Sequence, residues 1–224
     1  MPEPLRALGT EPSSLGPLTP PYRWNEAARR YIGPGGRFVP QSAIRGALET
    51  VIDASKGGIR ELSEALQAGR VTLAEWQLGM ARQIKLIHTA SGALAQGGWA
   101  QMSQADWGST GQLLRQQYAW LNNFAAEVGD GSQPLNGNFL RRANMYGDAG
   151  RGTYERQRQR LHRDQGYVEE MRVLAPVDNC EDCVDWAGHW APLGSLPPLF
   201  ASVCRTNCHC IFWFRTADGV VSEG

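Results

Sequence analysis

The chain has 224 residues, and its 22 basic and 22 acidic side chains give a formal net charge of zero. This neutrality excludes a protein whose whole surface attracts polyanions. A chain of this length can bury enough apolar surface for one or two domains. No run approaches the roughly 18 apolar residues of a membrane helix, and the first residues lack the pattern of a secretion signal. We therefore expect a soluble protein, made in a reducing compartment, without a membrane partner.

The N-terminal segment is rich in proline. Six of the thirteen prolines lie in the first 22 residues, at positions 2, 4, 12, 17, 20 and 21. Proline lacks a backbone donor and favours extended, polyproline-like conformations. A glycine-rich turn follows at residues 33–36, flanked by Tyr31-Ile32 and Phe38-Val39, which we interpret as short strands or an extended hook. We assign residues 1–39 to an extended N-terminal arm that ends in this turn.

Residues 40–170 are predicted to form a helical domain. Apolar residues recur every three or four positions, as on the buried face of a helix. Three helices carry the stripes Ile44, Leu48, Val51, Ile52, Ile59, Leu62 and Leu66; Trp76, Met80, Ile84, Ile87 and Leu94; and Trp107, Leu114, Tyr118, Leu121, Ala125 and Val128. Gly57-Gly58 is a candidate kink, and a fourth helix is expected over residues 139–165. Short connections favour antiparallel neighbours, hence a small bundle.

Two helix starts are marked by their capping residues. Thr72 precedes Glu75 by three positions, and Ser103 precedes Asp106 by three. In such a capping box each of the two side chains accepts a hydrogen bond from the backbone of the other residue. The second and third helices should therefore begin directly after Thr72 and Ser103.

The fourth predicted helix is unusually basic. Its arginines are Arg141, Arg142, Arg151, Arg156, Arg158, Arg160 and Arg163. Between Arg141 and Arg163 the only acidic residues are Asp148 and Glu155, which leaves a local surplus of positive charge. One interpretation is a contact with nucleic acid or an acidic protein surface. The other is a solvated face that pairs with carboxylates elsewhere, such as Glu169 and Glu170.

All five cysteines fall in the last quarter of the chain, which we assign to a third unit, residues 171–224. They are Cys180, Cys183, Cys204, Cys208 and Cys210. Thiolates at this spacing suit a tetrahedral, structural Zn²⁺ site. The alternatives are a disulfide with leftover thiols, or reduced cysteines packed as small hydrophobic residues. The odd number of cysteines argues against full pairing.

The expected ligand set is Cys180, Cys183, Cys204 and Cys208, with Cys210 as the substitute fourth ligand. His189 and His209 are left out because a lone turn histidine is more commonly not a ligand. The nearby carboxylates of Asp178, Glu181, Asp182 and Asp185 are expected to orient the ligands. With so many thiols, a closed site without an open position for substrate is favoured.

Catalytic motifs are missing from the sequence. It contains no H-E-x-x-H, no G-x-S-x-G and no nucleotide-binding fingerprint. Cys208 lies next to His209, but neighbours on a strand point to opposite faces. A redox pair of Cys180 and Cys183 would leave the other cysteines unused. We therefore expect no enzyme, and a thiol hydrolase or redox protein remains the alternative.

The cysteine-rich segment resembles a known family. Its order is C-x2-C, then G-x-W-x-P-x-G-S-x-P-P, then C-x2-N-C-x-C, over roughly residues 175–215. This resembles the C-terminal module of phage head-morphogenesis proteins, the minor head proteins, whose ending is similar to H-P-N-C-R-C. Asn207, Cys208 and Cys210 match that ending. The family's histidine and proline are absent, and Cys204, one position further upstream, stands in as a ligand. Residues 30–39 also look like stretches near the start of phage structural proteins.

The resemblance implies a non-enzymatic structural protein of the virion, assembled in the host cytoplasm and present in few copies. Its implied partners are portal, capsid or neck subunits, copies of itself, and packaged DNA. The fold class expected is mainly α: a helical bundle with an extended Pro-rich N-terminal arm and a small C-terminal Cys-rich lobe of zinc-knuckle type with short strands. Alternatives of function are a nucleic-acid-binding zinc protein, or a cement or baseplate protein.

Overall fold

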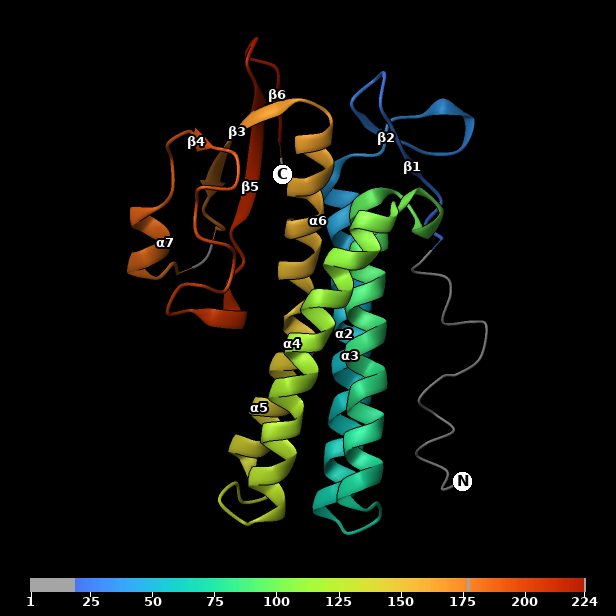
Figure 1. Cartoon of the computed structure of the whole chain (residues 1–224), viewed down its shortest axis with the longest axis vertical. Helices are drawn as coiled ribbons and strands as arrows, with labels where there is room; N and C mark the ends of the chain where they lie inside the picture. Colours follow the sequence, from blue (N-terminus) through green and yellow to red (C-terminus); the bar gives the residue numbers. More distant parts are fainter. Residues whose placement is uncertain (1–18, 177, 224) are drawn as a thin grey trace.

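The computed structural model of the protein describes residues 19–176 and 178–223. Long helices lie side by side, a lobe of short strands packs against one side of them, and a β-hairpin lies at one end (Figure 1). The predicted fold class, mainly helical with a small cysteine-rich lobe that contains strands, is confirmed. Most of the expected proline-rich arm falls on residues 1–18, which lie outside the described residues.

The helices account for most of the described chain. They are α2 Gln41–Gln67, α3 Leu73–Gln96, α4 Gln104–Gly129, α5 Gly137–Asp148, α6 Gly150–Asp164 and the short α7 Glu181–Asp185. Single turns of 3₁₀ helix are η2 Pro34–Gly36, η3 Trp99–Gln101 and η4 Arg205–Asn207. The strands are β1 Arg23–Asn25, β2 Arg30–Ile32, β3 Tyr167–Val173, β4 Ala191–Pro192, β5 Ile211–Thr216 and β6 Val221–Ser222. β3 crosses the expected boundary between the helical domain and the cysteine-rich unit at residues 170 and 171.

Local capping decides where α3 and α4 begin. The Thr72 side chain accepts a hydrogen bond from the backbone N–H of Glu75, and the Glu75 carboxylate accepts one from Thr72. Ser103 and Asp106 exchange the same two bonds at the start of α4. Both predicted capping boxes are therefore confirmed. The candidate kink at Gly57-Gly58 is wrong, because α2 runs unbroken from Gln41 to Gln67.

The fourth predicted helix is divided in two at Ala149. Its two halves, α5 and α6, pack against different neighbours. A Cβ atom at Gly147 would lie 2.5 Å from Lys56 of α2, and one at Gly150 would lie 2.7 Å from Ile87 of α3. The backbone therefore approaches α2 just before the division and α3 just after it. The single helix expected over residues 139–165 is corrected for this reason.

Two apolar cores fill the helical body. The first, centred on α2, α3, α4 and α5, contains the fully buried Trp76, Phe124 and Phe139, whose rings lie 5.3 to 5.5 Å apart. The second joins α2, α3 and α6 to the hairpin. The stripes of the first two predicted helices are buried here, except that Val51 is half-buried. No helix within the described part of the chain has the length and apolar character to span a bilayer.

The C-terminal lobe is built on an antiparallel sheet with the strand order β4-β3-β5-β6. It docks on α6 through buried polar groups. The guanidinium of Arg158 on α6 is fully buried and donates hydrogen bonds to the carbonyl oxygens of Phe212 (3.2 Å) and Glu223 (3.3 Å). The His162 ring stacks on Phe214, with 4.2 Å between centroids. These buried contacts join the lobe to the helical body.

Candidate metal centre in the C-terminal lobe

The pairing of β3 with β5 brings the two cysteine segments together. Val173, at the end of β3, pairs with Ile211, at the start of β5. The chain that leaves β3 and the chain that enters β5 therefore meet at one end of the sheet. After the first strand, Cys180 directly precedes α7 and Cys183 lies on it. The other three cysteines precede the second strand, around η4. β5 begins directly after Cys210.

The other four thiols gather around that of Cys183. Its Sγ atom lies 3.8 Å from the Sγ atoms of Cys204 and of Cys208. Cys183 belongs to two groups, one with Cys180 and Cys204 and one with Cys208 and Cys210, and within each group all sulfurs lie within 4.8 Å of one another. Sulfurs bound tetrahedrally to zinc at about 2.3 Å would lie about 3.8 Å apart. The donors and their spacing therefore fit a metal ion.

The expected ligands and their substitute all take part in these groups. Cys180, Cys183 and Cys204 form the first, and Cys208 and Cys210 complete the second. Among the described residues no four of these sulfurs form a single group, so the expected set of Cys180, Cys183, Cys204 and Cys208 spans both groups. Neither His189 nor His209 belongs to a group, and both are exposed. All five cysteines are free thiols.

The thiols differ in their acidity. The backbone N–H of Cys183 donates to the Cys180 sulfur and is the main reason that the pKa of Cys180 falls to about 7. Burial raises the pKa of Cys183 to about 11 and also raises that of Cys204. A shared hydrogen bond raises the pKa of Cys208 and lowers that of Cys210. Metal binding would therefore have to displace protons from the more buried sulfurs.

A buried arginine lies against this cluster. Arg172 on β3 is fully buried, and its Nη1 donates to the Sγ atom of Cys183 at 3.4 Å. Its guanidinium carbon lies 5.1 Å from the ring centroid of Trp186 and 5.3 Å from that of Phe212. Nη2 donates to the carbonyl oxygen of Pro197.

Among the residues that the structure describes, Arg172 has no carboxylate to balance its charge. None of the ion pairs between residues that the structure describes includes it. Burying an unpaired cation costs several kcal/mol. Thiolate sulfurs would compensate that charge, and a zinc ion with four thiolates carries a net negative charge. Arg172 therefore favours ionised sulfurs in the cluster, which is the state that a metal ligand requires.

Further contacts fix the segment that carries Cys204. The carboxylate of Asp182 on α7 accepts a hydrogen bond from the backbone N–H of Val203 at 2.9 Å. The hydroxyl of the buried Ser202 lies 2.9 Å from the Sγ atom of Cys204 and accepts from Cys183 at 3.5 Å. The cluster is thus held in place by neighbouring side chains, and Asp182 is the predicted acidic residue that does so.

The basic helix does not present one charged surface. Its ion pairs are Arg142–Glu127, Arg151–Glu49, Arg151–Asp148, Arg158–Glu155 and Arg160–Asp106. Arg158 is fully buried and has no surface for a partner. Arg141, Arg156 and Arg163 are exposed, without an ion pair among the described residues. Four of the seven arginines thus form ion pairs with carboxylates, as the pairing interpretation expects, and three remain available for a contact.

The carboxylates expected to pair with these arginines have other partners. Glu169 pairs with Arg215 at 2.6 Å, and the buried Glu170 accepts hydrogen bonds from Gln159 (2.6 Å) and from the backbone N–H of Leu196 (3.0 Å).

Within the described chain, Arg141 and Arg142 line a hollow of about 990 Å³ between the body and η4, together with the lobe's Arg205.

Sequence reasoning missed Arg172 and the burial of Arg158. An arginine within a strand or a helix normally indicates an exposed face, because its burial is costly. No simple signal was present, because strict alternation would place Val168 on the same face as Glu170 and Arg172. The register shift between Tyr167 and Glu169 instead leaves Val168 47% exposed, while Glu170 and Arg172 are buried.

Comparison with known proteins adds no relative. No family model matches the chain, and neither a curated protein nor a solved structure is significantly similar to it. The chain is therefore characterised by its own geometry: a mainly helical body and a lobe whose cysteines can hold a metal ion.

Proposed function

We propose that the protein is a non-enzymatic structural component with a structural zinc ion in its C-terminal lobe. The observation that carries the proposal is the convergence of five free thiols on Cys183 beside the fully buried, carboxylate-free Arg172. Four sulfurs fill the coordination positions of zinc, so such a site has no open position for a substrate. The ion would then supply folding free energy to the lobe.

We further propose that this component belongs to a phage virion, as a minor head or head-morphogenesis protein at the capsid, portal or neck. The support is the resemblance of residues 175–215, in which the matching Asn207, Cys208 and Cys210 end the segment. The docking of the lobe on α6 through buried groups suits a structural component. Its partners would be neighbouring structural subunits and further copies of the chain.

Mass spectrometry of density-gradient-purified phage particles tests the virion proposal. The expected result is that the protein copurifies with particles at low copy number relative to the major capsid protein. It should remain with them after a high-salt wash. Its presence in infected cells together with its absence from particles would contradict the proposal, whatever the zinc content of the isolated protein.

A further inference from the structure

The hairpin formed by β1 and β2 closes one end of the helical body. Trp24 pairs with Tyr31 across the hairpin, and both rings are buried. Successive side chains of a strand point to opposite faces, so Arg23 and Arg30 lie on the outer face, on either side of that buried pair. These two arginines are diagonal neighbours in the ladder, and their Cα atoms are about 7–8 Å apart in such a register.

Buried hydrogen bonds hold the hairpin on the end of α3. The hydroxyl of Tyr31 donates to the carbonyl oxygen of Ala95 at 2.5 Å, and that of Tyr22 donates to Leu94 at 3.2 Å. The Trp24 ring lies 5.5 Å from the His162 ring of α6. These contacts hold the hairpin against the helices, so its outer face is formed without a partner.

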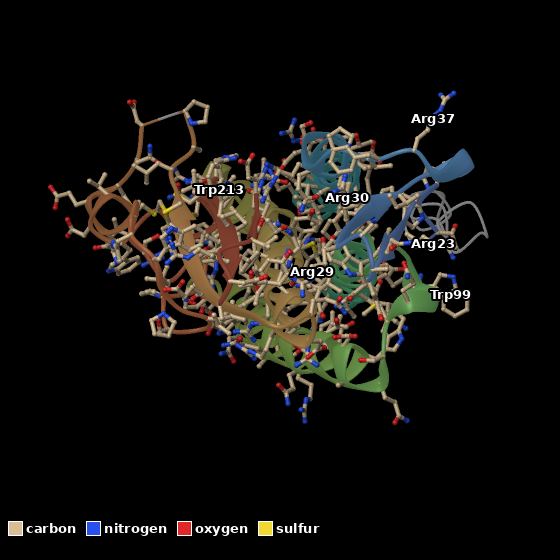
Figure 2. All side chains as sticks on the ribbon, turned by 90° about the horizontal axis from the view of Figure 1, so that it is seen from above. Arg23, Arg29, Arg30, Arg37, Trp99 and Trp213 are labelled. Atoms are coloured by element: carbon tan, nitrogen blue, oxygen red, sulfur yellow. The ribbon has the colours of Figure 1, made fainter. Side chains whose placement is uncertain are left out.

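A second segment is joined to the hairpin's edge. Gln101 of η3 accepts a hydrogen bond from the backbone N–H of Trp24 (2.9 Å) and donates one to its carbonyl oxygen (3.1 Å). Gly97 lies so close that a Cβ atom there would be 2.4 Å from the backbone nitrogen of Trp24. These contacts fix Trp99, at the start of η3, beside Arg23 (Figure 2).

Unpaired arginines cover this end of the molecule. Arg23, Arg29, Arg30 and Arg37 are all exposed, and none forms an ion pair with a described residue. Seen from above, Arg37 projects outward and Arg29 lies toward the lobe (Figure 2). Glu26 is the sole acidic residue in the sequence from 22 to 40, and Glu223 lines a hollow beside Arg29 and Arg30.

Two large aromatic side chains are exposed among these charges. Phe38 is 57% exposed and Trp99 is 52% exposed, whereas most aromatic rings of the body are buried. The Arg30 guanidinium carbon lies 5.6 Å from the Phe38 ring centroid. Exposed aromatic rings beside positive charges are the groups on which the bases of single-stranded nucleic acids stack.

We propose that this end surface, made of Arg23, Arg30, Arg37, Phe38 and Trp99, binds single-stranded nucleic acid. The arginine forks would contact phosphates, and the two rings would stack with bases. An acidic peptide would use the arginines but has no comparable use for the exposed rings. The hollow between the body and η4 also contains arginines, but its lining has no aromatic residue and includes Glu64 and Asp148.

Fluorescence anisotropy of the full chain with a labelled, mixed-sequence 20-nucleotide DNA strand tests the proposal across salt concentrations. We expect binding at low salt that weakens steeply as salt rises. Replacing Arg23, Arg30 and Arg37 together by Ala should flatten the slope of log affinity against log salt by about 2, at about 0.7 per phosphate contact. Trp99→Ala should weaken binding about tenfold without changing that slope.

The matched control removes the same charge elsewhere, by replacing the exposed Arg60, Arg141 and Arg156 with Ala. It should lower affinity far less than the hairpin variant, and circular dichroism should show that both variants keep their helices. Equal losses in the two triple variants would overturn the proposal, as would the absence of binding at low salt. Tighter binding to polyglutamate than to the strand, unaffected by Trp99→Ala, would also overturn it and indicate an acidic protein.

Discussion

The helical body and the C-terminal lobe are stabilised in different ways. The body buries large apolar side chains against one another, with Trp76, Phe124 and Phe139 at its centre. The core of the lobe includes Cys183, Cys208 and Cys210 among its buried residues. Small units seldom fold on apolar burial alone and commonly depend on a metal or disulfides. The comparison leads to the expectation that the lobe depends on an ion and the body does not.

The largest expected effect is on the lobe alone. Cys183→Ser removes the sulfur shared by both groups, and with it a metal-binding free energy on the order of 10 kcal/mol. We expect loss of bound zinc and unfolding from about Val173 onward, while the body stays helical. Limited proteolysis with mass spectrometry, and circular dichroism, would measure the two responses.

Val184→Ser is the matched control, because Val184 is the next residue of α7 and is 53% exposed. It should keep both the zinc and the protease resistance of the lobe. Unchanged protease resistance in the Cys183→Ser lobe would show that the lobe does not depend on the cluster.

The converse substitution should affect the body and spare the cluster. Phe124→Ala leaves a cavity beside Trp76 and Phe139, and we expect the free energy of unfolding to fall by about 3–5 kcal/mol. Zinc content should not change. Urea denaturation followed by circular dichroism gives the first quantity and elemental analysis the second. Loss of zinc from a variant that remains folded would mean that the two regions are not independent.

Acid should weaken the body through its buried histidine. Burial lowers the pKa of His88 to about 4, and its Nδ1 lies 2.5 Å from the hydroxyl oxygen of Thr153. Between that pKa and the unfolded value of about 6.5, the unfolded chain binds more protons, so stability falls as pH falls. We expect His88 to contribute a loss of about 2 kcal/mol between pH 7 and pH 5.

The measurement is urea denaturation at both pH values, for the native chain and for His88→Gln. His162, whose pKa is also lowered by burial, acts in the same direction and remains in the variant. The variant should therefore lose less stability on acidification than the native chain. Equal losses in the two proteins would rule out the role given to His88.

The smallest expected effect concerns the charge beside the cluster. Arg172→Met keeps much of the volume but removes the guanidinium that donates to Cys183, so zinc affinity should fall about tenfold, or ~1.4 kcal/mol. Competition with a chelator measures the affinity. Arg215→Met, which removes the partner of Glu169 elsewhere in the sheet, should leave the affinity unchanged. An Arg172→Met protein with native affinity would show that the charge does not support the sulfurs.

Features set by neighbouring residues could be predicted from the sequence. The capping boxes at Thr72 and Ser103 are local, and the recurrence of apolar residues every three or four positions located the helices. The division at Ala149 could not be predicted, because it depends on how closely Gly147 and Gly150 approach two other helices. The gathering of the cysteines was predicted from their chemistry. The burial of Arg172 and Arg158 opposes hydropathy and follows from tertiary packing alone.

The most direct test of the zinc centre is elemental analysis of the purified full chain, combined with X-ray absorption at the zinc edge. The proposal predicts one zinc per chain, bound by four sulfurs at about 2.3 Å, with one of the five thiols free to react with an alkylating reagent. A folded, protease-resistant lobe without metal, in which all five thiols react, would contradict it.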